Sequence, residues 1–220
     1  MRNGDLVLVT GASRSGKSRY VNTNIDKHRA VIVWDPQDEY GKFAPECFSD
    51  AQQLRALWSG KVAARRVRVH CPYDGAELKH QFSLTCMAVL AYRSELKQSG
   101  PVVFVAEELA DVTNPGKATQ GWGMLQRTGR KRNITTYGIT QSPAESDKTI
   151  VRNANIVHCC ALGRAIDRRY MEKELDLPRD SLNALNFGDK SGDFVHWTRG
   201  KGAQWGSLNF STGRTTPKRR

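Results

Sequence analysis

Residues 11–18, GASRSGKS, constrain the fold of this chain more than any other stretch of its 220 residues. They match the pattern G-x-x-x-x-G-K-[ST] and lie between an apolar run, DLVLVT (5–10), and a helical pattern, GKSRYVNTNID (16–26). Between a strand and a helix, such glycines let the backbone curl so that its N–H groups face phosphate oxygens at the helix N-terminus. The stretch therefore predicts a phosphate-binding loop.

The predicted nucleotide-binding residues are those of the loop itself: Gly11, Ala12, Ser13, Arg14, Ser15, Gly16, Lys17 and Ser18. In this type of loop the lysine, here Lys17, reaches the β- and γ-phosphates, and the hydroxyl of Ser18 ligates Mg²⁺. We therefore expect ATP and Mg²⁺ as cofactors.

The rest of the chain alternates apolar runs with helical patterns. Strands are predicted over 30–34, 65–71, 102–106, 134–140 and 155–162, and helices over 50–60, 83–100 and 163–177. Ser83 is the expected N-terminal cap of the long helix, and the alternation in 65–71 indicates a half-buried edge strand. Continuous apolar strands separated by helices indicate an α/β fold with a mostly parallel sheet covered on both faces.

The C-terminal end has a different character from the rest of the chain. Residues 193–210 predict a hairpin, which makes this end small and β-rich. We expect a single domain over 1–212, followed by a basic, flexible tail over 213–220.

The charge balance favours a polyanionic partner. Lysine and arginine exceed the acids by 34 to 22, which gives a net charge of +12. Much of the excess is clustered, at 127–133, 163–169 and 216–220. Nucleic acid is the first expectation and a membrane surface the second, and the alternative is a generally basic protein without such a partner.

Composition also bears on location. No apolar run approaches the roughly 18–20 residues of a membrane-spanning helix, and the N-terminus lacks the pattern of a signal peptide. Five cysteines without CxxC spacing argue against a disulfide framework and a zinc site, and the pair Cys159–Cys160 is expected in a buried strand. We expect a protein of a reducing, intracellular compartment.

A pair of acids follows the apolar strand 102–106. A nucleotide hydrolase needs carboxylates at such a place to support Mg²⁺ and to activate water. We expect Glu107 to approach the metal through water and Glu108 to act as the base. The usual pair is Asp-Glu, so Glu107 is a departure that leaves the division of roles open. The alternative is an ordinary helix start, where acids are also favoured.

Two further polar residues follow predicted strands. Gln141 comes after the strand 134–140 and is placed to sense the γ-phosphate or to position water, unless it is a loop residue without a role. Asp35, in WDPQDEYG (34–41), either supports the metal site from behind the ligands or ends its strand in a turn with Pro36.

The succession GASRSGKS, VVFVAEE, GRKRNITTYGITQSP and VRNANIV resembles the FtsK–HerA superfamily of P-loop ATPases over roughly residues 5–162. Within it, the small size resembles the genome-packaging ATPases of tailless icosahedral, membrane-containing double-stranded DNA viruses. The resemblance implies a RecA-like fold that hydrolyses ATP as a ring, typically a hexamer, around DNA. It also implies an arginine finger that acts on a neighbouring subunit; Arg127, Arg130 and Arg132 match that segment, and Arg130 or Arg132 is preferred.

The implied partners are double-stranded DNA, further copies of the chain, and capsid or portal-vertex proteins, in the host cytoplasm or the virion. Candidate DNA-binding residues are Lys117, Arg127 and Lys131. The glycine-rich stretch 113–123 is expected to be a mobile loop that presents Lys117 and Trp122 to the DNA channel.

Other functions remain open from the sequence. A small-molecule P-loop kinase fits the size, with the arginine-rich segment as a phosphate-clamping lid. A filamentous-phage-type assembly ATPase shares the P-loop and the TQSP region, although such proteins usually carry a transmembrane helix. A repair or plasmid-transfer translocase would use the same motifs. A GTPase is disfavoured because N-K-x-D is absent, and a transporter ATPase because L-S-G-G-Q is absent.

Overall fold

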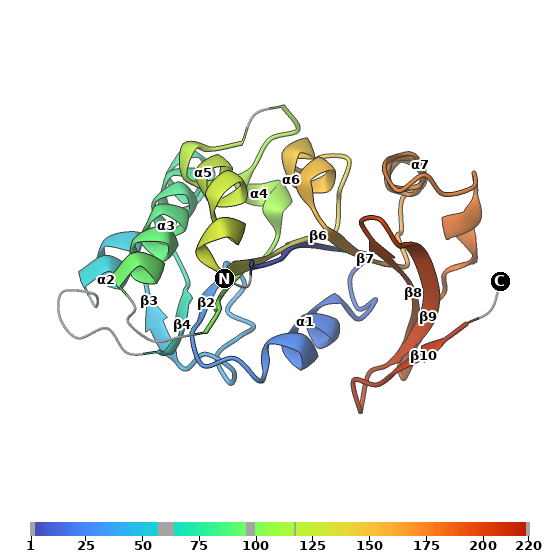
Figure 1. The fold of residues 1–220 in the computed structure, drawn as a ribbon, viewed down its shortest axis with the longest axis horizontal. Helices are drawn as coiled ribbons and strands as arrows, with labels where there is room; N and C mark the ends of the chain where they lie inside the picture. The colour runs from blue at the N-terminus through green and yellow to red at the C-terminus, as the bar shows by residue number, and fades with distance from the viewer. Residues whose placement is uncertain (1–2, 57–63, 96–99, 117, 219–220) are drawn as a thin grey trace.

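The computed structural model describes residues 3–56, 64–95, 100–116 and 118–218 (Figure 1). The described strands form one sheet in the order β10-β9-β8-β7-β1-β6-β5-β2-β4-β3. Their bounds are β1 (Leu6–Thr10), β2 (Val31–Trp34), β3 (Glu46–Phe48), β4 (Arg66–Val69), β5 (Val102–Ala106), β6 (Ile134–Thr140), β7 (Ile156–Cys160), β8 (Ser191–Thr198), β9 (Gly202–Asn209) and β10 (Thr215–Pro217). Strands β1 to β7 pair in parallel, and β8 to β10 continue the sheet in antiparallel pairing. This is the mostly parallel α/β sheet with a β-rich C-terminal end that the sequence predicts.

Helices cover both faces of the sheet. They are α1 (Lys17–Ile25), α2 (Ala51–Ala56), α3 (Gly75–Glu95), α4 (Leu109–Val112), α5 (Gln120–Thr128), α6 (Lys148–Asn153) and α7 (Ala165–Glu174), with short 3-10 helices η1 (Arg130–Arg132) and η2 (Ser181–Ala184). Figure 1 shows α1 below the sheet and α3, α5, α4 and α6 above it. None of the described helices is both long enough and apolar enough to cross a bilayer.

Strand β1 shows why the central strands are apolar throughout. Leu6 and Leu8 point into the larger core, which includes residues of α3 and α5, whereas Val7 and Val9 point into a second core that includes Val21 of α1. Since side chains alternate between faces, a strand covered on both sides is apolar at every position. Because β1 and β5 both run parallel to β6, the loops that follow them lie at the same edge of the sheet.

Two predictions about local structure were wrong. The long helix α3 begins at Gly75, and Ser83 lies inside it, where its Oγ accepts a hydrogen bond of 2.9 Å from the N–H of Gly121. The strand β4 is not an edge strand, because it pairs with both β2 and β3. Its polar side chains Arg66 and Arg68 face acids and carbonyls of the segment 26–45, which explains an alternation that would otherwise indicate solvent on one face.

The C-terminal end forms the predicted hairpin from β8 and β9. Beyond it, the structure places Thr215–Pro217 in strand β10 against β9, where the sequence predicts a tail that begins at 213. Lys218 also forms an ion pair of 2.6 Å with Asp193. A backbone ladder that the sequence cannot show therefore holds most of this segment; residues 219–220 lie outside the described part.

Candidate nucleotide-binding site

The loop between β1 and α1 has the curled backbone that phosphate binding requires. Gly16, directly before the helix, has φ 103°, and Arg14 also lies in the left-handed region with φ 61°. A Cβ at Gly16 would lie 2.5 Å from Cε1 of Phe210, so both the conformation and the packing require glycine there. The described loop is thus closed from one side by the segment that follows β9.

Lys17 is the buried cation of this loop. Its side chain folds back so that Nζ donates a hydrogen bond of 2.9 Å to the carbonyl oxygen of Ala12, and the residue is only 8 % exposed. Burial lowers the pKa of Lys17, against the opposing effects of the Cys160 thiol and of Glu107 and Glu108. The ammonium group therefore lies within electrostatic reach of the two acids that the sequence singles out.

Glu107 follows β5 and is held by a residue that the sequence did not indicate. The hydroxyl of Tyr40 donates a hydrogen bond to Oε1 of Glu107. Burial raises the pKa of Glu107 to about 7, although the Tyr40 hydrogen bond and Lys17 act to lower it. A tyrosine in a loop carries no recognisable pattern, so only the tertiary structure identifies Tyr40.

Asp35 acts on this acid through Tyr40. Its side chain is fully buried, and its two oxygens accept backbone N–H groups of Glu39 and Tyr40, each at 2.9 Å. Asp35 thereby fixes the turn that carries the Tyr40 phenol to Glu107. Asp35 thus ends its strand in a turn, as one of the two sequence interpretations has it. A role of Asp35 behind the metal ligands stays a prediction.

Glu108 is tied to the end of the neighbouring strand β6. Its Oε1 accepts hydrogen bonds from Oγ1 of Thr140 at 3.1 Å and from the backbone N–H of Gln141 at 3.3 Å. Its φ of 42° is unusual for a residue with a side chain, a conformation that typically costs on the order of 1 kcal/mol or more. The structure therefore brings the backbone of Gln141 into contact with Glu108. Gln141 itself is exposed to solvent.

The arginine-rich segment lies where β6 begins, at the opposite end of the parallel strands from the acid pair. Arg130 and Arg132 belong to η1, directly before β6, whereas Gln141 directly follows β6. Strand β6 has seven residues, and a rise of about 3.3 Å per residue places the two ends roughly 20 Å apart. Arg130 Nε donates to the carbonyl of Gly4 at 3.3 Å, and the side chains of Lys131 and Arg132 are exposed. These arginines cannot reach the phosphate loop of their own chain.

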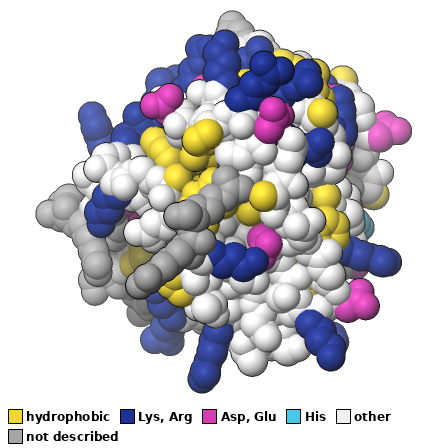
Figure 2. All heavy atoms as spheres, turned by 90° about the vertical axis from the view of Figure 1, so that its right-hand side faces the viewer, with side chains coloured by type: hydrophobic (Ala, Val, Ile, Leu, Met, Phe, Trp, Pro, Cys, Tyr) yellow, Lys and Arg dark blue, Asp and Glu magenta, His cyan; other side chains and the backbone are white. Residues whose placement is uncertain are grey.

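The predicted DNA-binding residues are only partly placed. Arg127, on α5, and Lys131 are exposed, and Lys117 lies outside the described residues. The prediction for Trp122 was wrong, because this residue lies in α5, fully buried, with its Nε1 donating to Asp147 at 3.0 Å. Figure 2 shows Lys and Arg side chains gathered along the upper part of the face that carries α7 and the C-terminal strands. On α7, Arg169 and Lys173 are exposed.

The donor groups at the phosphate loop fit Mg²⁺. Magnesium is usually held by one or two carboxylates together with hydroxyl, water and phosphate oxygens, rather than by a cage of protein ligands. Ser18 in the first turn of α1 and Glu107 after β5 offer this set of oxygens. Cys159 and Cys160, which neighbour the site, are buried in β7 as predicted.

The fold is that of a RecA-like P-loop NTPase. A phosphate loop follows β1 and an acid pair follows β5, and strand β6, which lies between them, is followed by the polar residue Gln141. The comparisons with known proteins agree. No protein-family model matches the chain. Protein P9 of Pseudoalteromonas phage PM2 is 36% identical over 180 residues, which cover 81% of this chain and 78% of Protein P9. The chain therefore belongs to the family of Protein P9.

Solved structures share the fold. The genome packaging NTPase B204 of Sulfolobus turreted icosahedral virus 2, in complex with sulfate, superimposes with a TM-score of 0.67 at 14% identity, over 100% of this chain and 98% of B204. The complex of B204 with ATP-gammaS gives a TM-score of 0.66. VirB4 of Thermoanaerobacter pseudethanolicus gives 0.57 at 12% identity, over 86% of each chain. At these identities the likeness establishes the fold alone.

Proposed function

We propose that this protein is an ATP-hydrolysing motor that translocates double-stranded DNA and packages a viral genome into a preformed capsid. The observation that carries the proposal is the gathering of Lys17, Glu107 and Glu108 at one edge of the sheet, with Gln141 beside Glu108. The family relation to a phage protein and the fold shared with a genome packaging NTPase support the packaging role.

The proposed chemistry follows from these positions. Lys17 and the N–H groups of the loop hold the β- and γ-phosphates of ATP. Ser18 and Glu107 would hold Mg²⁺, which when bound neutralises phosphate charge. Glu108 takes the proton of the attacking water, and its bonds to Thr140 and Gln141 keep its carboxylate aimed at one place. Gln141 senses whether the γ-phosphate is present.

The opposite placement of the arginines supports action between subunits. A guanidinium on the transferring phosphoryl group accelerates such reactions by about 10³–10⁵-fold. Since η1 lies roughly 20 Å from the end of β6, Arg130 or Arg132 would act on the nucleotide of a neighbouring copy. A closed ring, for which we propose a hexamer, supplies that neighbour to every site.

The positive charge supports DNA as the partner. A net charge of +12 suits a motor that holds phosphates irrespective of base sequence. We propose Arg127 and Lys131 as DNA contacts, with Lys117 as a further candidate. Capsid or portal-vertex proteins would then be partners during packaging, in the host cytoplasm or at a vertex of the virion.

Steady-state hydrolysis of ATP with and without long double-stranded DNA tests the proposal. We expect DNA to stimulate hydrolysis, and the stimulation to fade between about 50 and 200 mM salt, because each phosphate contact releases counterions. The variant Lys17→Ala should be inactive under all conditions. Undiminished turnover by Lys17→Ala would refute the site, and hydrolysis indifferent to DNA at both salt concentrations would refute the translocase.

A further inference from the structure

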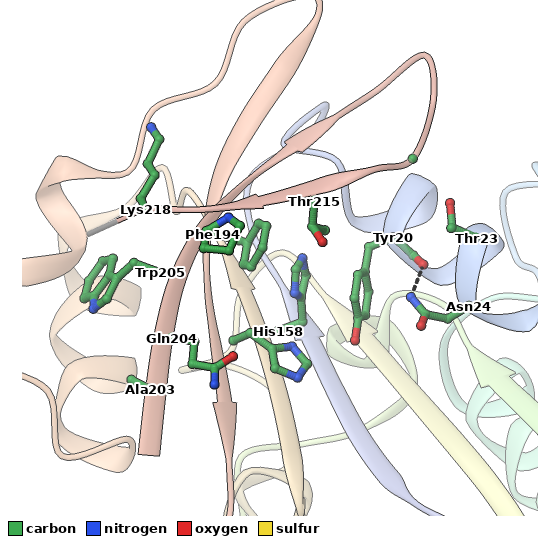
Figure 3. Close-up of a pocket in the computed structure, with 13 residues that line it drawn as sticks. Tyr20, Thr23, Asn24, His158, Phe194, Ala203, Gln204, Trp205, Thr215 and Lys218 are labelled. Carbon is green, nitrogen blue, oxygen red and sulfur yellow. Dashed lines mark hydrogen bonds between the residues drawn. The ribbon is translucent and has the colours of Figure 1, made fainter. Parts of the chain in front are cut away.

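A cavity lies beside the phosphate loop, on the face of the sheet that α1 partly covers (Figure 3). Its volume is about 680 Å³. Helix α1 forms one wall through Tyr20 and Thr23, and the curved strands β7 to β10 form the floor and the opposite wall. This volume lies within the range of about 300–1,000 Å³ that is typical of small-molecule sites.

Aromatic rings form the buried floor. The rings of Tyr20 and His158 stack with centroids 3.6 Å apart and an angle of 3°, and Phe194 lies 4.5 Å from His158. Figure 3 shows Phe194, His158 and Tyr20 side by side. A Cβ at Gly206 would lie 2.4 Å from the Phe194 ring, so a glycine on β9 makes room for this arrangement.

His158 is the unexplained member of this floor. It is fully buried, and neither of its ring nitrogens has a hydrogen-bond partner among the described residues. Burial, with a smaller contribution from His196, lowers the pKa of His158 well below its usual value, so the ring is neutral and offers one N–H donor and one nitrogen acceptor. Buried polar atoms are nearly always paired, so the two unpaired nitrogens distinguish this floor from an ordinary apolar core.

The rim of the cavity is polar and carries little free charge. Thr23, Gln204 and Thr215 line it with exposed side chains. Among the described lining residues only Lys218 is charged at neutral pH, and its ammonium is paired with Asp193 at 2.6 Å. A ligand that fits this cavity therefore carries no charge on the part that the cavity holds. Its apolar faces lie against the aromatic rings, and its polar atoms lie along its edges, toward the polar rim.

These requirements separate the ligand classes. An aliphatic group would make no hydrogen bond to the polar side chains of the rim, and a carboxylate or ammonium ion would find no free opposite charge. A planar heteroaromatic ring satisfies both needs, because its faces stack and its edge atoms donate and accept hydrogen bonds. We propose that this cavity binds a nucleobase, presented by a nucleoside, a nucleotide or an unpaired stretch of nucleic acid.

The segment 210–213 separates the cavity from the phosphate loop and contacts both. Phe210 packs against Gly16, whereas Gly213 packs against Thr23, which lines the cavity. Arg19 Nη2 donates to the carbonyl oxygen of Ser211 at 2.6 Å, which fastens this segment to α1. A base in the cavity would thus press on the same segment that closes the phosphate loop.

Adenosine tests the proposal because it has the base but no phosphate. Binding to the full chain is measured by calorimetric titration, which does not require hydrolysis, so the outcome is independent of the proposed motor activity. The blocking variant is Thr215→Trp, since Thr215 faces the cavity (Figure 3). The matched control is Thr216→Trp, the next residue of the same exposed strand, which points to the other face.

We expect adenosine to bind the wild-type chain with a Kd below about 1 mM. Thr215→Trp should weaken binding by about tenfold or more, equal to at least about 1.4 kcal/mol, and Thr216→Trp should leave it unchanged. The proposal is overturned if no saturable binding occurs, or if both tryptophan variants bind as the wild type does. Equal thermal melting of the two variants shows that both are folded.

Competition identifies the source of the base. If ATP displaces adenosine from the wild type but not from Lys17→Ala, the base belongs to the nucleotide held by the phosphate loop. If a single-stranded oligonucleotide displaces adenosine, the base belongs to unpaired nucleic acid. If neither competes, the cavity takes a free nucleoside. Each of these results supports a nucleobase site.

Discussion

The hydroxyl of Tyr40 donates a hydrogen bond to Glu107, 67 residues further along the chain, and joins the turn after β2 to the acid after β5. The turn itself is held by Asp35, whose carboxylate accepts the N–H groups of Glu39 and Tyr40. A buried acid is thus held in place from the adjacent strand, and it keeps a raised pKa because burial outweighs the hydrogen bond. The free energy of unfolding of the nucleotide-free protein should therefore depend on pH through the titration of Glu107.

The first prediction concerns Glu107→Gln. The folded pKa of Glu107, about 7, lies above the ordinary value of 4.5, so folding favours the protonated form. Its contribution to stability is fully present below pH 4.5 and is lost as pH rises through 7. Glutamine imitates the protonated acid and should stabilise the protein by up to about 3 kcal/mol at pH 8, with little effect at pH 4.5.

Urea unfolding at the two pH values measures this difference. Glu77→Gln, an exposed acid on α3, is the matched control and should change stability by less than about 0.5 kcal/mol at either pH. A Glu107→Gln variant that is destabilised at pH 8 would contradict the role of burial.

The second prediction concerns Tyr40→Phe, which keeps the buried ring and removes the hydroxyl. At pH 8 the variant should lose about 1–3 kcal/mol, because a hydrogen bond to a charged acceptor is lost. In the Glu107→Gln background the loss should be smaller by about 1 kcal/mol, since the acceptor is then neutral. Denaturant unfolding of the four proteins of this double-mutant cycle gives the coupling energy, and additive effects would show that the two side chains do not interact.

The third prediction concerns Thr140→Val. The substitution keeps the shape of the side chain but removes the hydroxyl that donates to Glu108. We expect kcat for ATP hydrolysis to fall by about tenfold with little change in KM, because Glu108, the proposed base, is no longer held in place. Thr136→Val, at a buried position of the same strand, is the control and should retain kcat. Equal loss in both variants would point to a general effect on the strand.

The fourth prediction concerns action between subunits. Arg130→Ala and Glu108→Gln should each be inactive, whereas their mixture should regain hydrolysis, because an Arg130→Ala site can receive the arginine of a Glu108→Gln neighbour. Mixing Glu108→Gln with Lys17→Ala is the control, since both changes damage the same edge of the sheet, and we expect no recovery. If the first mixture also stays inactive, Arg130 does not act in trans, and the same mixture with Arg132→Ala tests the other candidate.

The sequence by itself determined the parts of this protein that depend on local pattern. The phosphate loop, the fully apolar strands and the C-terminal hairpin each follow from residues adjacent in the chain. Parallel strands then bring their C-terminal ends to one edge, which is why Glu107, Glu108 and Gln141 were predicted at one site.

The tertiary structure decided what depends on contacts between distant segments. Tyr40 and Thr140 orient the two acids, yet neither belongs to a motif, because a single hydrogen bond across the sheet leaves no periodic trace in the sequence. Trp122 looked like part of a mobile loop because glycines surround it, but α3 and Asp147 bury it. Likewise Thr215–Pro217 became a strand only through its pairing with β9, since the free energy of a backbone ladder depends on the partner strand rather than on the segment itself.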